Sequence, residues 1–145
     1  MTYNEWLETI ELVEKSNRNH IYLQKMISAP NNENINELLK PKLVDLITNK
    51  LKKAIKRIIH NLRDTFHNSN TLEFTISNFE KELEYIYSIC NLPEIDQNTR
   101  NEIMVAIKEQ RDRVYEILIN KSLEIDRTGM YKIIIEKKKN GKKVI

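Results

Sequence analysis

The sequence predicts a mainly α-helical protein: an antiparallel helical bundle of three long and two to three short helices, with a C-terminal β-hairpin. Three observations favour this fold class. Apolar residues recur at three- and four-residue steps over long stretches, which is the period of an amphipathic helix. The chain of 145 residues has only two glycines and three prolines, too few turn formers for a sandwich, a barrel or a many-turned α/β fold. This length suits one domain with a modest core.

Short helices are predicted in the N-terminal part of the chain. Thr2 and Glu5 have the spacing of a capping box, in which each side chain bonds a free backbone N–H, so we expect a helix over residues 2–15. Apolar residues cluster again within 21–27, which predicts a second short helix. A further turn of helix leads to Pro41, and because proline suits a first helical position, we expect a new helix to begin there.

Three long helices are predicted at 41–67, 71–92 and 97–124. Asn68 and its neighbours offer caps for the second of them, and Asp96 offers one for the third. The residues expected to point inward are Val44, Ile47, Leu51, Ile55, Ile58, Leu62 and Phe66, then Leu72, Ile76, Phe79, Leu83, Ile86 and Cys90, then Ile103, Ile107, Val114, Ile117, Leu118 and Ile125. Short connections between long helices favour antiparallel neighbours, so a bundle over residues 1–128 follows.

The C-terminal segment, residues 129–145, predicts a basic β-hairpin or tail. Asn140-Gly141 lies between two potential strands, and Asn-Gly is the preferred pair for a type I′ turn. A two-residue loop there places Tyr131, Ile133, Ile135 and Val144 on one face. A two-stranded ribbon is marginal alone in water, so it packs on the bundle, pairs with another chain or frays. A disordered basic tail with an apolar anchor is the alternative.

Charge is organised in blocks that the net charge of +3 conceals. Residues 50–67 carry six basic and one acidic side chain, residues 68–126 carry six and twelve, and residues 127–145 carry seven and one. Dense basic blocks suit the phosphates of a nucleic acid or an acidic protein partner. The candidate binding residues are Lys50, Lys53, Lys56, Arg57, Arg63, Lys137, Lys138, Lys139, Lys142 and Lys143.

A solvated face, partly neutralised within the chain, is the alternative for the first basic block. The following helix carries four glutamates, and antiparallel packing would bring them beside the lysines. These glutamates are Glu73, Glu80, Glu82 and Glu84. No aromatic residue lies among the C-terminal lysines beyond Tyr131, so base stacking of a single strand is poorly supported.

Some apolar residues lie away from the inward stripes of the last two long helices. They are Tyr115, Ile119, Leu123, Phe74, Tyr85 and Ile89. Either the hairpin or the N-terminal helices cover them, or they form a patch that binds a protein partner or a second copy of the chain.

The sequence contains few residues that could carry catalysis or bind a cofactor. With glycine at 129 and 141 only, neither a P-loop nor a dinucleotide-binding fingerprint is present, and we expect no cofactor. His60 and His67 lie about 10 Å apart along a helix, too far to share one metal ion, so we expect no metal. The single cysteine, Cys90, falls on an apolar stripe, and one cysteine suits a reducing, cytoplasmic compartment. No stretch approaches the roughly 20 apolar residues that span a membrane.

One short segment carries an enzymatic hint. Arg63 and His67 lie four apart, on adjoining turns of the predicted helix 41–67. The segment resembles the motif of small helical ribonucleases of the HEPN group, in which an Arg is followed, after four to six residues, by a His, with paired sites across a dimer. Here three residues intervene, and the resemblance covers five residues. It implies Arg63 and His67 as catalytic residues.

These observations favour a small, non-enzymatic binding or regulatory protein that acts through protein–protein contacts. The apolar patch would supply affinity and the charged blocks would steer the partner. The small size and the Asn-, Ile- and Lys-rich composition fit an inhibitor or adaptor of a phage or mobile element. A nucleic-acid-binding protein that uses the basic helix 50–63 and the basic hairpin is the alternative, and a HEPN-like ribonuclease is the third.

Overall fold

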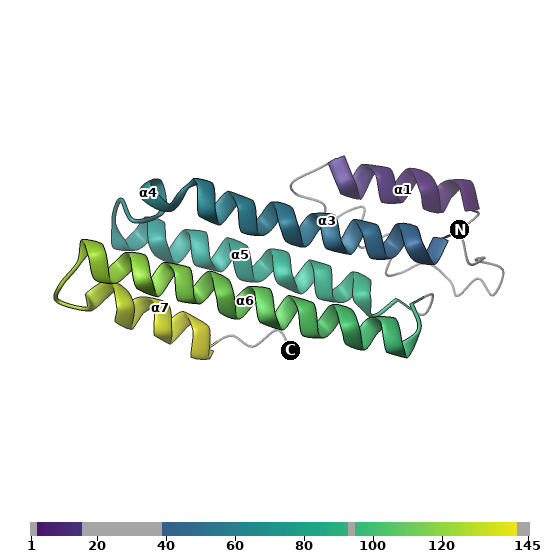
Figure 1. Cartoon of the computed structure of the whole chain (residues 1–145). Coiled ribbons are helices and arrows are strands. Elements are labelled where there is room, and N and C mark those ends of the chain that lie inside the picture. Colours follow the sequence, from purple (N-terminus) through teal and green to yellow (C-terminus); the bar gives the residue numbers. More distant parts are fainter. Residues whose placement is uncertain (1–2, 16–38, 93–94, 142–145) are drawn as a thin grey trace.

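A computed structural model describes residues 3–15, 39–92 and 95–141, and every regular element within these ranges is a helix. The helices are α1 (Tyr3–Lys15), α3 (Leu39–His60), α4 (Leu62–Thr65), α5 (Ser69–Cys90), α6 (Gln97–Ile125) and α7 (Met130–Gly141). Helices α3, α5 and α6 lie side by side and alternate in direction, with α1 along α3 and α7 at the opposite side of the bundle (Figure 1). The predicted mainly α-helical fold is confirmed.

The helix starts follow the predicted capping residues where the structure describes them. Asn68 Oδ1 accepts the backbone N–H of Thr71 at 2.8 Å, and Asp96 Oδ1 accepts that of Thr99 at 2.7 Å. These bonds satisfy N–H groups that have no partner inside a helix. The predicted helix over 41–67 instead begins at Leu39 and is interrupted at Asn61. Thr2 of the expected capping box and the short helix within 21–27 lie outside the described residues.

The core is the shared apolar interior of α3, α5 and α6. All six residues predicted to point inward from α5 are buried, Cys90 among them. In α3 the buried stripe is wider than predicted. Leu46, which is not among the residues predicted to point inward, is 1% exposed and lies on the side of α3 that faces α1. Ile125, predicted to point inward, is 46% exposed because it is the last residue of α6, where the chain turns toward α7.

The predicted C-terminal β-hairpin is wrong for residues 130–141, which form helix α7. Its apolar residues also have helical spacing, and packing against α5 and α6 selects that conformation over the β-propensity of three consecutive isoleucines. Ile135 is fully buried, and the Tyr131 ring packs edge-on against Phe66 at 5.8 Å between centroids. Ile133, which the hairpin would place beside Ile135, is 64% exposed. Val144 lies outside the described residues.

The turn between α6 and α7 is fixed by one carboxylate. Asp126 Oδ1 accepts from the backbone N–H of Thr128 at 3.0 Å and from its hydroxyl at 2.6 Å, and Oδ2 accepts from the N–H of Tyr131 at 3.3 Å. Gly129 follows with φ of 79°, a left-handed conformation that glycine adopts without a steric penalty. This turn sets the start of α7 and so its direction back along α6.

Asp126→Asn is expected to weaken the native fold at neutral pH but not in acid. The hydrogen bond from the Thr128 side chain lowers the pKa of Asp126 from its ordinary 3.8. A group with a lowered folded-state pKa stabilises the fold above its unfolded pKa, and this stabilisation is lost as the pH falls through the folded value. Urea unfolding at several pH values should show that the native chain has a higher free energy of unfolding than the variant at pH 7, and that this difference narrows below pH 3.8. A difference that does not change with pH would contradict the stabilisation of the turn by the Asp126 carboxylate.

Candidate functional site

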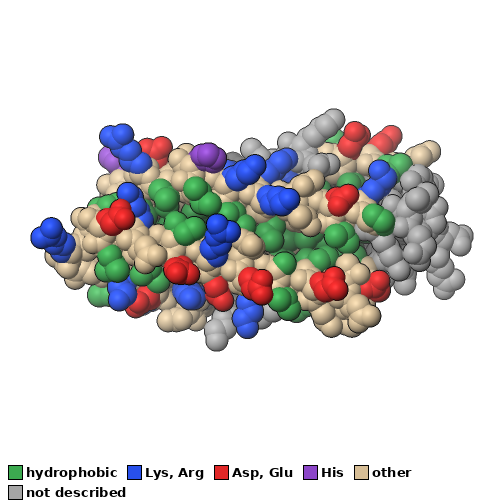
Figure 2. Space-filling model, in the orientation of Figure 1, with side chains coloured by type: hydrophobic (Ala, Val, Ile, Leu, Met, Phe, Trp, Pro, Cys, Tyr) green, Lys and Arg blue, Asp and Glu red, His purple; other side chains and the backbone are tan. Residues whose placement is uncertain are grey.

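A surface groove of about 630 Å³ lies between α3, α4 and α5. We call it the α3–α5 groove. Its floor is apolar, since it contains Ala54, Ile58 and Phe79, all of which are nearly inaccessible to solvent. On its α5 side, Phe74 is 64% exposed and Tyr85 is half-buried. Apolar side chains are visible along the middle of the face in Figure 2, with Lys and Arg above them over α3.

The groove and helix α1 lie on different faces of α3. Residues of α1 share a crevice with residues 42–49, in the first half of α3. The groove uses the other half, from Ala54 onward, where α1 no longer runs alongside (Figure 1). Helix α1 packs on α3 on the side away from α5 (Figure 1), so it does not cover the apolar surface that α3 and α5 share at the groove.

One ion pair crosses the groove. Arg57 on α3 donates from Nη1 to Glu82 on α5, and the two side chains are 42% and 25% exposed. Burial raises the pKa of the Glu82 carboxyl, and the positive charges of Arg57 and Lys50 oppose that rise. The expected neutralisation of the basic block by acids of the next helix is therefore present at this pair.

The two predicted basic blocks lie on different sides of the molecule. On α3, Lys53, Lys56 and Arg57 are exposed and Lys50 is half-buried, while Arg63 is exposed on α4. Helix α7, which carries the second block, packs on α5 and α6 at the opposite side of the bundle from α3 (Figure 1).

In that second block, Lys137 is exposed, and Lys138 and Lys139 are half-buried. Lys138 Nζ donates to the Ser77 hydroxyl of α5 at 3.4 Å, so this cation is used within the fold. Lys142 and Lys143 lie outside the described residues.

The predicted apolar patch is divided by the fold. Tyr115 and Ile89 are 0% and 1% exposed, so these two residues form no surface. The helical stripe did not predict their burial because each helix has neighbours on more than one side: α6, for example, contacts α3, α5 and α7. Phe74 belongs to the α3–α5 groove together with Tyr85. Leu123 is 50% exposed on α6, and Ile119 is half-buried against the core.

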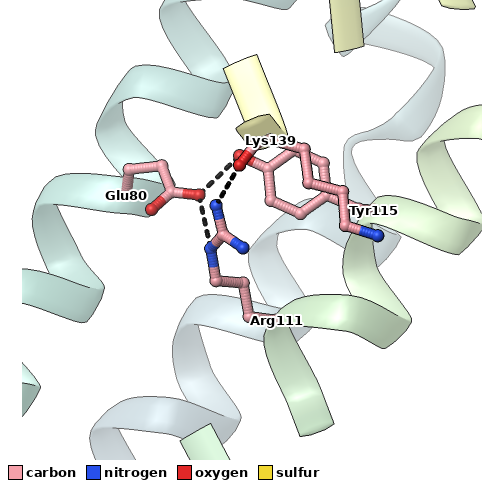
Figure 3. A network of polar contacts seen from close by, with 4 residues as sticks. All are labelled: Glu80, Arg111, Tyr115 and Lys139. Atoms are coloured by element: carbon pink, nitrogen blue, oxygen red, sulfur yellow. Dashed lines mark hydrogen bonds and ion pairs between the residues drawn. The ribbon is translucent and has the colours of Figure 1, made fainter. Parts of the chain in front are cut away.

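A buried polar network explains the position of Tyr115 (Figure 3). Glu80 of α5 is 1% exposed, and its Oε1 accepts from Arg111 Nε at 2.9 Å and from the Tyr115 hydroxyl at 2.5 Å. Arg111 Nη2 also donates to the Lys139 carbonyl of α7 at 2.9 Å, and its guanidinium lies 4.8 Å from the centre of the Tyr115 ring. The network thus joins α5, α6 and α7.

The network is structural in character. Burial, and then the hydrogen bond to Glu80, raise the pKa of the Tyr115 phenol above its usual range, so the hydroxyl stays protonated and donates. Substrate has no access to a Glu80 carboxylate that is 1% exposed. The sequence pattern did not predict this role. Glu80 lies four positions after Ile76 and three positions before Leu83, two residues predicted to point inward, and this position on the inward face is the signal that could have revealed it.

Arg63 and His67 do not share a helix face as predicted. Helix α4 ends at Thr65, so Arg63 lies on the helix and His67 in the turn beyond it. Both side chains are exposed. The arrangement that suggested a ribonuclease motif on adjoining helical turns is therefore not formed.

Other site classes find no support in the part of the chain that the structure describes. No group of three His, Cys, Asp or Glu side chains there is arranged to hold a metal ion. No described helix is long and apolar enough to cross a membrane. Cys90 is fully buried, its thiol donates to the Arg100 carbonyl at 3.6 Å, and burial raises its pKa, which disfavours the reactive thiolate.

The α3–α5 groove combines an apolar floor, the exposed Phe74, the half-buried Tyr85 and charged residues. Its Phe74 and Tyr85 were among the residues that the sequence pattern singled out, and so was Arg57. Comparisons of this chain with protein-family models, with curated proteins and with solved structures find no match, so the groove itself carries the functional argument.

Proposed function

We propose that this protein is a non-enzymatic binding or regulatory protein that contacts a protein partner through the α3–α5 groove. The observation that carries the proposal is the exposure of Phe74 beside an apolar floor. Phe74 is 64% exposed, although phenylalanine is among the side chains most often buried. Large apolar side chains that stay exposed around a concavity are typical of protein-binding surfaces.

The composition of the groove suits a protein partner. An aromatic side chain that enters a partner's pocket typically supplies a large part of the binding free energy, and Phe74 and Tyr85 lie on the same side of α5. Charged residues of the groove, among them Arg57 and Lys81, would form a polar rim around that contact.

The proposal is tested by selecting binding peptides from a displayed random library on the immobilised native protein. Peptides that bind should lose at least tenfold in affinity for the Phe74→Asp variant, because the charge would be desolvated in the contact. Ile133→Asp is the matched control, since Ile133 is also 64% exposed but lies on α7, away from the groove. Affinities are measured by fluorescence anisotropy, after circular dichroism has shown that both variants are folded.

Two outcomes contradict the proposal. Selected peptides that bind Phe74→Asp as tightly as the native chain but fail on Ile133→Asp would move the binding site to α7. A selection that enriches no peptide above background would argue against a protein-binding groove.

A nucleic-acid-binding protein is the second candidate, favoured by the exposed cations of α3 and α4. Lys53, Lys56 and Arg63 are all exposed there. It ranks second because the basic residues of α7 lie on the far side of the bundle and would not join the same contact. Binding of labelled DNA or RNA that weakens steeply with salt, and that is lost when Lys53 and Lys56 are reversed to Glu, would place it first.

A further inference from the structure

We infer that the occupant of the α3–α5 groove is an amphipathic α-helix of about three to four turns whose apolar stripe is flanked by Asp and Glu. This inference rests on the proposed function and adds the chemistry of the partner. Three features of the groove lead to it: its length, the spacing of its aromatic side chains and the sign of the charges beside it.

The length of the groove matches a short helix. On α5 its lining runs from Thr71 to Tyr85, and fourteen helical steps of about 1.5 Å give about 21 Å. On the other side the lining runs from Ala54 on α3, past the break at Asn61, to Thr65 on α4. A helix of three to four turns spans the same distance, and a helix laid between two others is a common packing arrangement.

The aromatic residues have a spacing that a helix can match. Phe74 and Tyr85 are eleven positions apart, which returns to nearly the same angle around α5 after three turns. They therefore border the groove near its two ends, about 16 Å apart. A partner helix with apolar residues at positions i, i+4, i+7 and i+11 presents a stripe that contacts both aromatic side chains and the floor between them.

The charges at the end of the groove between Ala54 and Tyr85 favour carboxylates on the partner, because two cations and one carboxylate line that end. Arg57 lines it from α3 and Lys81 lines it from α5, where Lys81 is exposed. Arg57 donates from Nη1 to Glu82, but a guanidinium carries five N–H donors and this one is 42% exposed, so it can bond a carboxylate of the partner as well.

The two acidic residues of the groove lining differ in their contacts. Glu82 is engaged with Arg57, and Asp64 lies at the α4 end. Carboxylates on the part of a partner helix that lies beside Ala54 and Tyr85 would thus meet Arg57 and Lys81, whereas lysines there would meet like charge. Complementary charge at the rim raises the rate of association and disfavours partners of the wrong sign.

The test compares synthetic helical peptides that share one apolar stripe and differ only in its flanks, which are Glu in one peptide and Lys in the other. A third peptide keeps the Glu flanks and has Ser in place of the apolar stripe. Binding to the full chain is measured by fluorescence anisotropy at low and high salt. The Glu-flanked peptide should bind at least tenfold more tightly than the Lys-flanked one, and the difference should shrink at high salt. The Ser peptide should bind far more weakly.

Lys81→Glu is the variant that locates the charge effect. Because Lys81 is exposed, its reversal should leave the fold intact and should weaken binding of the Glu-flanked peptide by at least threefold. Lys108→Glu, which changes another exposed lysine, on α6 and outside the groove lining, is the matched control and should not change the affinity.

The outcomes separate this inference from the proposed function. If both peptides bind equally and both lose affinity for Phe74→Asp, the groove binds proteins but the acidic partner is wrong. Tighter binding of the Lys-flanked peptide overturns the inference in the same way. If neither helix binds while library peptides still depend on Phe74, the partner is not a helix. Equal binding of the Ser peptide and its apolar counterpart would show that charge alone drives the contact, which also overturns it.

Discussion

Arg111→Ala is expected to lower the free energy of unfolding by about 3 kcal/mol, which follows from removing one partner of a buried ion pair. Glu80 would keep the Tyr115 hydroxyl as a donor, but its carboxylate would stay buried without the guanidinium that balances its charge. The Lys139 carbonyl of α7 would lose a donor at the same time. One substitution thus weakens the contacts among three helices.

The matched control for this prediction is Arg113→Ala. Arg113 lies on the same helix two positions further and is exposed, so its removal should change stability by less than about 0.5 kcal/mol. Urea denaturation followed by circular dichroism measures both variants. Equal midpoints for the two would show that the network contributes nothing to the fold.

A double-mutant cycle then separates the pair from its surroundings. Replacing Glu80 with Leu and Arg111 with Met removes both charges while it keeps much of their volume. Since Arg111→Met, like Arg111→Ala, leaves the Glu80 carboxylate without its partner, the double variant should recover part of the stability that Arg111→Met alone loses. A double variant whose loss equals the sum of the two single losses would mean that the residues are not coupled.

Ile135→Ala is expected to lower stability by about 3 kcal/mol, whereas Ile133→Ala should change it by less than about 0.5 kcal/mol. Ile135 is fully buried between α7 and the bundle, and its truncation leaves a cavity. Ile133 is 64% exposed on the outer face of the same helix. Chemical denaturation of the two variants gives both values under one set of conditions.

This pair also distinguishes a C-terminal helix from a hairpin. In a strand, residues two apart share a face, so Ile133 and Ile135 would be covered together and the two substitutions would have similar effects. In a helix they lie about 200° apart, and only one faces the core. Similar losses at both positions would therefore contradict α7.

The sequence predicted best where one apolar stripe faces one interior. The stripe from Leu72 to Cys90 on α5 is buried at every predicted position, and the caps at Asn68 and Asp96 form as expected. These features depend on local spacing and on one backbone bond each, so neighbouring residues suffice to reveal them.

The sequence predicted least where a second neighbour matters. Tyr115 and Ile89 lie off the predicted stripes, and the sequence left open whether they are covered or belong to a binding patch. Both are buried because their helices are covered on more than one side. Ile133 to Ile135 have strong β-propensity, and only the partner surface on α5 and α6 decides for a helix. Propensity and periodicity contain no information about which helices meet.

The candidate site was predicted in part for the same reason. The pattern identified Phe74 and Tyr85 as spare apolar residues and Arg57 as part of a basic face. That these three line one groove depends on how α3 packs against α5 and on the pairing of Arg57 with Glu82. Neither fact can be derived from the spacing of residues within a single helix.

The buried network has a consequence for the order in which the chain is made. The ribosome synthesises α5 and α6 before α7. Glu80, Arg111 and Tyr115 are therefore present for a time without α7, the helix that places Ile135 in the core. During that interval the nascent protein exposes apolar surface next to a charged pair, a combination that chaperones and proteases meet in incompletely folded chains. Docking of α7, with its Lys139 carbonyl on Arg111, ends that vulnerable stage.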